Sequence, residues 1–455
     1  MKKTVMATMA FAAFALAGTP LVAQDSFGFG EDVSSTEQQS GSGSLGAKVS
    51  GEVYASVCPY VFDLESFDEL KDYDLGSIFS GKISIEASGA NGEAHVTFKV
   101  AKPETAGDLP VTLGEAYLRG YFGKLDVEAG LRDLTWGKAD SQGPLDVVNP
   151  LDLTDLTVTD AMERKIPVPM VHASYSLGDF TKLEGVFVPS FEGHSIDYSG
   201  RWKPYMLTNL EASLPALAAA AMVPLTGITV QTTPPDTSSL QNWQGGARLT
   251  TTLLSNDFGL QYYFGLLPKP AAKIDVIPGT SIDVSLLYNR YHQIGADWAA
   301  DVAGFNARAE VAANLTEDMA GTDPAVYNSS IAWSLGFDRD LFAGINLNLQ
   351  GAGTVRLAQD GIDTSMVDIE RGKGLTHTTI TGVVSRKFLK DALELKVTGL
   401  WGIEDKDYLV MPALVWTTGD VEVALSGGFF GGDKAGDLGQ YAANGYAKLD
   451  VTYRF

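Results

Sequence analysis

The sequence predicts a transmembrane antiparallel up-and-down β-barrel of about 18 strands with long external loops. Three observations lead to this all-β fold class. Segments in which apolar and polar residues alternate recur from residue 45 onward, short turns alternate with long polar connections, and the last residues form one more alternating segment. After the N-terminal segment, no apolar run reaches the roughly 18 residues that a membrane helix needs. Because strand boundaries inferred from a sequence pattern are often misplaced, barrels of about 14 or 16 strands are the alternatives to 18.

The N-terminus predicts export from the cytoplasm. Residues 1–3 are a basic start, residues 5–17 are an apolar run, and small residues follow. This order is typical of a secretory signal peptide, which we expect to span residues 1–23. Residues 24–44 are rich in Ser, Gln, Gly and acidic residues, so we expect a flexible periplasmic leader. The barrel is then expected to occupy residues 45–455.

Successive segments of this region place apolar side chains on one face and polar side chains on the other. In residues 81–87, Ile83 and Ile85 alternate with Lys82 and Ser84. Period-two alternation is the pattern of a strand with one face toward lipid and the other toward a polar lumen. The same pattern recurs in residues 96–100, 125–132, 331–338, 345–350, 421–426 and 447–455.

Short and long connections alternate along the chain, as expected of barrels with short periplasmic turns and long external loops. Tight turns are predicted at residues 88–92, 122–124, 177–179, 255–257, 295–297, 338–340 and 418–420. Longer connections are predicted at residues 57–75, 133–167, 191–242, 269–280 and 358–372. Residues 387–391 must turn without glycine.

Residues 447–455 are expected to close the barrel by pairing with the first strand, near residues 45–55. An alternating segment that ends in Phe, here Phe455, resembles the closing strand of bacterial outer-membrane barrels, where it is an assembly signal. The resemblance implies localisation in the bacterial cell outer membrane. It also implies contact with outer-membrane lipid and with the barrel-assembly machinery.

Composition and motifs exclude several functions. A formal net charge of -23 argues against nucleic acid as a partner. The single Cys58 cannot form an internal disulfide. The 5 histidines are scattered, and we find no metalloprotease, phosphate-binding or dinucleotide-binding motif. We therefore expect a protein that is not an enzyme and that has no metal or cofactor.

The most distinctive motif joins a strand end to the loop after it. Residues 130–132 (Gly-Leu-Arg) are followed by Trp136-Gly137 and, further on, by Asn149-Pro150-Leu151-Asp152. This segment resembles a proteobacterial outer-membrane barrel family of unknown function, which carries a Trp-Gly pair and then an Asn-Pro-x-Asp segment. The matching residues are Arg132, Trp136, Gly137, Asp146, Asn149, Pro150 and Asp152. At Asp133 the family more often has Gln. The resemblance implies handling of lipidic or other hydrophobic compounds.

Residues 133–167 are predicted to fold inward and narrow the pore, because long ordered loops are commonly functional. The candidates for this constriction are Trp136, Asp146, Asn149, Pro150 and Asp152. One alternative is an external cap without substrate contact. Another is a calcium site built from the acidic residues of the loop, although their spacing does not match an EF-hand.

Charged residues on the polar strand faces are predicted to line the lumen. Arg132 alternates with Asp126 and Glu128, so its guanidinium is expected to lie among carboxylates. The pore-lining candidates are Lys99, Glu115, Arg119, Asp126, Glu128 and Arg132. Arg119 and Arg132 are expected on adjacent strands at a constriction. The alternative for each residue is mutual pairing that rigidifies a closed barrel.

A second long loop contains the Ala-rich residues 210–225. They are expected to form a short helix at the mouth, or the small core of the loop itself. The function predicted for the whole chain is a porin-like channel for passive diffusion of small solutes. The alternatives are an outer-membrane transporter of hydrophobic or lipidic substrates, and a surface adhesin or structural barrel.

Overall fold

A computed structural model describes residues 46–61, 76–101, 110–140, 143–158, 160–231, 237–363, 365 and 367–455. The predicted signal peptide and leader lie outside these residues. Within them, no helix is long and apolar enough to cross a membrane.

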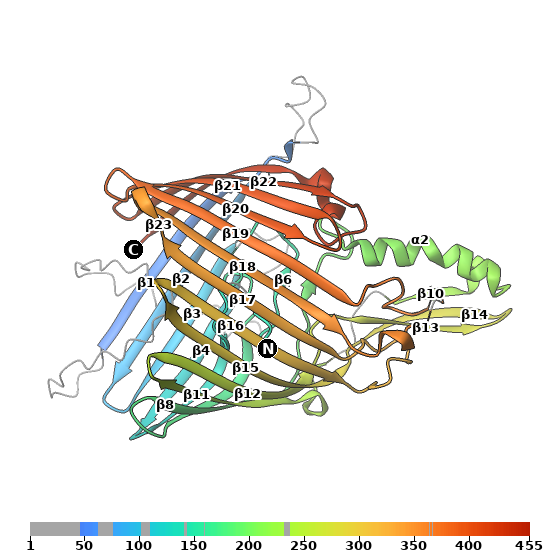
Figure 1. The fold of residues 1–455 in the computed structure, drawn as a ribbon, viewed down its shortest axis with the longest axis horizontal. Coiled ribbons are helices and arrows are strands. Elements are labelled where there is room, and N and C mark those ends of the chain that lie inside the picture. The colour runs from blue at the N-terminus through green and yellow to red at the C-terminus, as the bar shows by residue number, and fades with distance from the viewer. Residues whose placement is uncertain are drawn as a thin grey trace, which may run out of the picture. The chain divides into compact units, whose positions relative to one another are not determined.

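The main sheet has 18 strands, each antiparallel to its neighbours, and it closes on itself (Figure 1). Its strands, in order around the barrel, are β1 (Gly46–Val57), β2 (Ile78–Gly89), β3 (Gly92–Ala101), β4 (Val111–Phe122), β5 (Leu125–Arg132), β7 (Val168–Ser176), β8 (Thr181–Val188), β11 (Gln244–Leu253), β12 (Asn256–Leu266), β15 (Arg290–Val302), β16 (Phe305–Thr316), β17 (Ser330–Asp340), β18 (Ile345–Arg356), β19 (Thr376–Phe388), β20 (Leu393–Gly402), β21 (Asp407–Thr418), β22 (Val421–Gly432) and β23 (Tyr446–Arg454). The last strand pairs with the first, from Glu52 opposite Arg454 to Val57 opposite Leu449. The predicted strand number and closure are confirmed.

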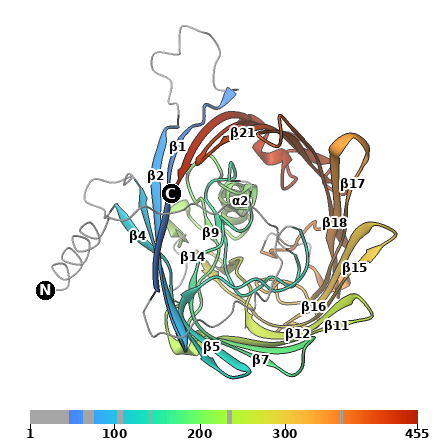
Figure 2. The same cartoon turned by 90° about the vertical axis from the view of Figure 1, so that its left-hand side faces the viewer.

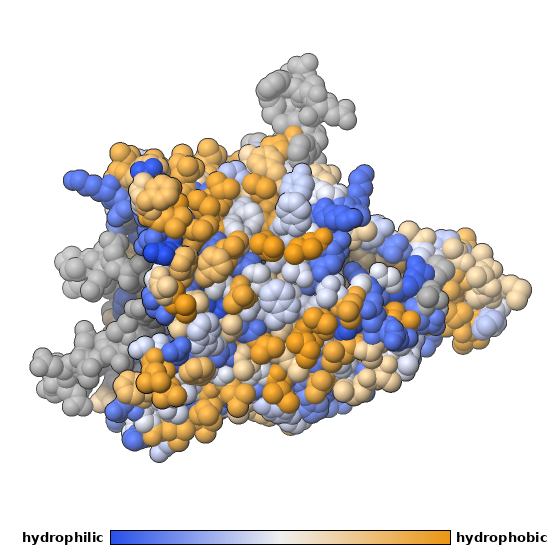
Figure 3. Space-filling view, viewed as in Figure 1, coloured by the Kyte–Doolittle hydropathy of each residue, from blue (hydrophilic) through white to orange (hydrophobic). Residues whose placement is uncertain are grey.

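The strands separate an apolar outer face from a polar inner face. On β23, Leu449 and Tyr453 are 44% and 45% exposed on the outside, whereas Lys448 and Thr452 are each 8% exposed inside. Apolar side chains cover much of the outer wall (Figure 3). Closure pairs the backbone polar groups of every strand, which lipid requires. A closed antiparallel barrel with an apolar exterior is an outer-membrane structure.

Most predicted turns join the strands as expected, but two are misplaced. Residues 295–297 lie inside β15, and the chain turns instead at Ala303-Gly304. Residues 338–340 end β17, and the turn follows at residues 341–344. The turn without glycine is observed: Leu389, Lys390 and Asp391 adopt φ values of 54°, 58° and 68°.

Two external loops together build a small subdomain at the external end of the barrel (Figure 1). The loop after β8 supplies α2 (Tyr205–Ala220) and β10 (Ile228–Val230), and the loop after β12 supplies β13 (Ala271–Ile277) and β14 (Ser281–Leu287). β10 pairs parallel with β14, which pairs antiparallel with β13. Leu214, Ala218, Val223, Ile282 and Val284 form its buried core. The Ala-rich segment therefore belongs to a small core, and residues 269–280 contain a strand.

The remaining short elements lie in loops and turns. They are β6 (Asp152–Leu153), β9 (Ser195–Ile196) and the 3-10 helices at Leu225–Gly227, Leu240–Asn242, Phe342–Gly344, Gln359–Gly361 and Gly439–Asn444.

Candidate functional site

Residues 133–167, here called the inner loop, follow β5, and their described part (133–140, 143–158 and 160–167) lies inside the barrel. Figure 2, which looks along the barrel, shows this segment within the ring of strands. Glu310 of β16 holds it there: its carboxylate accepts the backbone N–H of Lys138, of Ala139 at 2.7 Å and of Leu145 at 3.3 Å. Glu310 is only 3% exposed. We call this set of contacts the Glu310 latch.

Two glutamine side chains on neighbouring strands extend the latch. Gln261 of β12 donates to the carbonyl oxygen of Leu145 at 2.9 Å. Gln293 of β15 donates to the carbonyl oxygen of Pro144 at 3.0 Å, and it accepts from Gln261 at 2.9 Å. Both side chains are almost fully buried. The loop backbone thus finds its hydrogen-bond partners on the barrel wall, as buried polar groups require.

Apolar contacts seat the first half of the inner loop. Trp136 and Val148, each 2% exposed, pack in one cluster with Tyr263 of β12 and Tyr291 of β15. The rings of Trp136 and Tyr263 meet edge to face, with centroids 6.4 Å apart. The burial of these side chains stabilises the inward position of the loop.

The structure explains why the prediction of a turn at residues 295–297 is wrong. A Cβ on Gly295 would lie 2.2 Å from Cδ2 of Leu145, so glycine makes room on the wall for the inner loop. Asp297 pairs with Arg248 of β11 at 2.7 Å, and both side chains are nearly fully buried. Gly295 therefore allows close packing and Asp297 forms an ion pair inside the lumen, although glycine and aspartate so close together in a sequence are typical of a turn.

Asn149 ties the two ends of the inner loop together. Its side-chain oxygen accepts the N–H of Leu134 at 2.7 Å, and its amide donates to the carbonyl oxygens of Arg132 at 3.0 Å and Ile166 at 2.9 Å. Asn149 is 3% exposed, and Pro150 beside it is buried. The Asn-Pro segment of the predicted motif thus holds the base of the loop together. We call these three hydrogen bonds of Asn149 the clasp.

Asn149→Ala is expected to lower the free energy of unfolding by about 2–4 kcal/mol, because it leaves one buried N–H and two buried carbonyl groups unpaired. Denaturant unfolding of the protein folded into vesicles measures this change. Asn346→Ala is the control, since Asn346 makes an exposed hydrogen bond to Asp340. A loss as small for Asn149→Ala as for the control contradicts the clasp.

The acidic residues of the inner loop have separate partners. Asp146 pairs with Lys165 at 2.8 Å, and burial raises the pKa of Asp146 despite this partner. Asp152, which is exposed, and Asp155 each accept the N–H two residues further on, as in Asx turns. Asp160 does the same. Because these carboxylates do not converge, the described residues do not support a calcium site in this loop.

The inner loop is joined to the next external loop by a short parallel pair, β6 with β9. Next to this pair, the N–H of Leu151 donates to Nδ1 of His194 at 2.9 Å. The N–H of Ser195 donates to the carbonyl oxygen of Leu151 at 2.9 Å. Burial, with a smaller contribution from Lys269, lowers the pKa of His194 to about 4 from 6.5. The neutral imidazole is therefore the form that joins the two loops.

Acid is expected to loosen this junction. Since the pKa of His194 is lowered in the folded protein, its stabilising contribution is complete above pH 6.5 and is lost as the pH falls toward about 4. The hydrogen-exchange protection factor of the Leu151 amide should fall across this range. The Leu134 amide is the control, because its acceptor is the non-titrating Asn149. Equal changes at both amides would refute the assignment to His194.

Four of the predicted lumen residues lie on β4 and β5. Three of them form one cluster, and the fourth lies beside it where the inner loop begins. Glu128, 5% exposed, contacts both Arg119 and Arg132, and it lies 3.0 Å from Nδ1 of His172. Glu115 accepts the N–H of Asp133 at 3.3 Å, where the inner loop begins. The structure therefore brings Arg119, Arg132 and Glu128 together and places Glu115 at the loop base.

The two remaining pore-lining candidates lie elsewhere. Asp126 is on the same face of β5 as Glu128, nearer the periplasmic turn. Lys99 is exposed on β3, opposite Lys82 of β2. Whether any of these residues acts on a solute stays a prediction.

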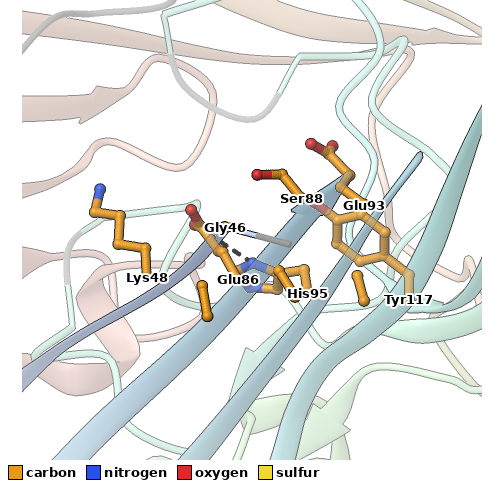
Figure 4. Close-up of a pocket in the computed structure, with 10 residues that line it drawn as sticks. Gly46, Lys48, Glu86, Ser88, Glu93, His95 and Tyr117 are labelled. Carbon is orange, nitrogen blue, oxygen red and sulfur yellow. Dashed lines mark ion pairs between the residues drawn. The ribbon is translucent and has the colours of Figure 1, made fainter. Parts of the chain in front are cut away.

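An open pocket of about 420 Å³ lies at the periplasmic end of β1–β4 (Figure 4). His95 lies 3.5 Å from Glu86 and stacks on Tyr117, with ring centroids 5.3 Å apart. Lys48 and Ser88 also line the pocket, together with Glu93, which pairs with Arg119 at 2.6 Å. This side of the lumen is polar and accessible to water.

Sequence reasoning did not identify the partners of the inner loop. Glu310 was recognisable as a lumen residue by alternation, but its role depends on residues more than 160 positions away, such as Leu145. Gln261 and Gln293 carry one usable signal, since each is a buried polar residue at an inward strand position. Such positions suggest a partner inside the lumen.

Comparisons with known proteins agree with this architecture. A family model described as "Protein of unknown function (DUF1302)" matches residues 89–264, which include the inner loop. The predicted resemblance to a barrel family of unknown function is thus confirmed. A search of curated proteins gives no match.

Among solved structures, the outer membrane protein OpdK from Pseudomonas aeruginosa aligns with a TM-score of 0.50 and 10% identity, over 90% of this chain and 99% of that chain. Pseudomonas aeruginosa OccK8 (OprE) aligns with a TM-score of 0.50 and 9% identity, over 90% and 98%. These similarities show a porin-like barrel fold.

Proposed function

We propose that the protein is an outer-membrane channel for passive diffusion of small polar solutes, with the inner loop as its constriction. The observation that carries the proposal is the set of inward charges that remain exposed on β1–β3, beside an inner loop that is anchored inside the barrel. The Glu310 latch holds the first half of this loop against β16, and Leu156 in its second half packs against the cluster that contains Cys58 and Tyr446. In this proposal, residues 1–23 direct export and β23 engages the assembly machinery.

The exposed charges support a hydrated passage along β1–β3, beside the loop. Lys48, Lys82 and Lys99 are exposed, and the side chain of Glu86 is 52% exposed. Removing a charged side chain from water without a partner costs free energy, so the positions of these side chains indicate water inside the barrel. The porin-like fold agrees with such a passage, which needs no catalytic residue.

Single-channel recording in planar bilayers tests the proposal. A steady conductance that is proportional to voltage supports a diffusion channel. A folded barrel that never conducts contradicts it.

Arg132→Ala is expected to shift ion selectivity toward cations. Arg132 has 18% of its side chain exposed next to the inner loop, so its loss removes positive charge near the constriction. The reversal potential in a salt gradient measures the shift. Arg339→Ala is the matched control, because Arg339 lies over the Phe305 ring on the outer face near a periplasmic turn. An unchanged reversal potential for Arg132→Ala counts against its position in the pore.

One observation favours the alternative of a transporter for hydrophobic substrates. Leu409, Met411 and Val415 alternate along the inner face of β21, and Leu400 of β20 lies beside Leu409. Near the external end, Leu409 joins a buried cluster with Trp202. Binding of fatty-acid-like ligands, seen as a change in tryptophan fluorescence, together with an absence of conductance would support this alternative.

A further inference from the structure

Three metal-ligating side chains converge at the external end of the barrel. His377 lies at the start of β19, Asp405 lies in the turn between β20 and β21, and Asp437 lies in the loop between β22 and β23. Nε2 of His377 is 3.2 Å from Oδ2 of Asp405 and 3.2 Å from Oδ2 of Asp437. The three possible ligand atoms all lie within 4.8 Å of one another.

A buried carboxylate fixes the two aspartates relative to each other. Asp407, 1% exposed, accepts the N–H of Leu438 at 2.6 Å and of Gly439 at 3.1 Å. The loop that carries Asp437 is therefore bound to the strand end that carries Asp405. A Cβ on Gly436 would lie 2.5 Å from Oδ2 of Asp407, so this loop needs glycine to pack so closely.

The donor set suits one class of ion. Bonds of about 2.0–2.2 Å from zinc to nitrogen or oxygen imply ligand-to-ligand separations of roughly 3.4 Å in a tetrahedral site. The two distances of 3.2 Å from His377 are close to that value. Two carboxylates and a neutral imidazole carry a charge that a divalent cation balances. An imidazole ligand favours Zn²⁺ and similar transition metals over Ca²⁺ and Mg²⁺, which prefer oxygen.

We propose that His377, Asp405 and Asp437 bind one divalent transition-metal ion of the Zn²⁺ type at the external rim. The side chains of His377 and Asp437 are 38% and 63% exposed, so the ion can enter from solvent and keep water as a further ligand. The bound ion would connect β19 with the β20–β21 turn and the β22–β23 loop. This site lies outside the inner loop.

Titration of the purified, folded full-length barrel with Co²⁺ and Zn²⁺ after chelator treatment tests the proposal. We expect one ion per chain, with Co²⁺ absorption bands that Zn²⁺ removes. His377→Gln and Asp437→Asn should each weaken binding by more than about tenfold. His95→Gln is the matched control, since His95 faces only one carboxylate, that of Glu86 at 3.5 Å.

Three outcomes overturn the proposal. They are no binding by the unaltered barrel, binding that survives His377→Gln, and equal losses for His377→Gln and His95→Gln. The heat-dependent gel mobility of folded barrels shows that each variant is folded before titration. Since conductance is not measured, failure here leaves the proposed channel function unaffected.

Discussion

Glu310→Ala is expected to raise the single-channel conductance several-fold. Glu310 accepts the backbone N–H groups of Lys138, Ala139 and Leu145, and hydrogen bonds to a charged group contribute about 1.5–3 kcal/mol each. Without the carboxylate, these three groups lose their acceptor on β16, and within the described residues only the ion pair of Asp140 with Arg308 still joins this part of the inner loop to that strand. The first half of the loop can then move away from β16, so the channel should also become noisier.

Planar-bilayer recordings of Glu310→Ala and of Glu86→Ala compare the same change of charge at two lumen positions. Glu86 is exposed at the periplasmic end and pairs with His95, away from the inner loop. Glu310→Gln should give an intermediate conductance, because its amide oxygen keeps one acceptor. If Glu310→Ala and Glu86→Ala change conductance equally, the latch does not hold the constriction.

Val384→Arg is expected to destabilise the folded barrel in lipid by up to about 2–4 kcal/mol, because it places a charge on the apolar outer face of β19. Val384 is 47% exposed, and its cross-strand neighbours Leu347 and Val397 are also apolar. Val383 provides an unusually close control. It is the same residue type on the same strand, but it faces the lumen opposite Asn348 and Thr398.

Equilibrium unfolding of the protein from vesicles should show a much smaller loss of stability for Val383→Arg than for Val384→Arg, since an arginine at position 383 can reach water. Equal losses for the two variants would refute the assignment of faces on β19.

The barrel itself could be predicted because the pattern that specifies each strand lies within a few consecutive residues. Each strand repeats a two-residue pattern, and the lipid face must be apolar whatever the rest of the chain does. Tight turns were harder, since Gly295 and Asp297 look like turn residues but serve the inner loop and Arg248. A sequence pattern cannot distinguish a glycine that turns the chain from one that makes room for a distant side chain.

The inner loop was predictable in its path but not in its attachments. Trp136 and Asn149 stood out as residues of a distinctive segment, and both are buried at its base. Its attachments depend on which strands lie opposite once the barrel has closed, and Glu310 and Gln293 come from strands far along the chain. For the same reason, the sequence does not predict that His377, Asp405 and Asp437 lie together. They come from three separate external connections, which meet only in the folded barrel.

The parallel pair of β10 and β14 limits how the external surface can be exchanged between related barrels. β10 comes from the loop after β8, whereas β14 comes from the loop after β12, and both contribute to one core with α2. A graft of either loop alone would leave Ile282 or Leu214 without its partners. The two loops share this core, so antigenic or engineered variation of the core should alter both loops together.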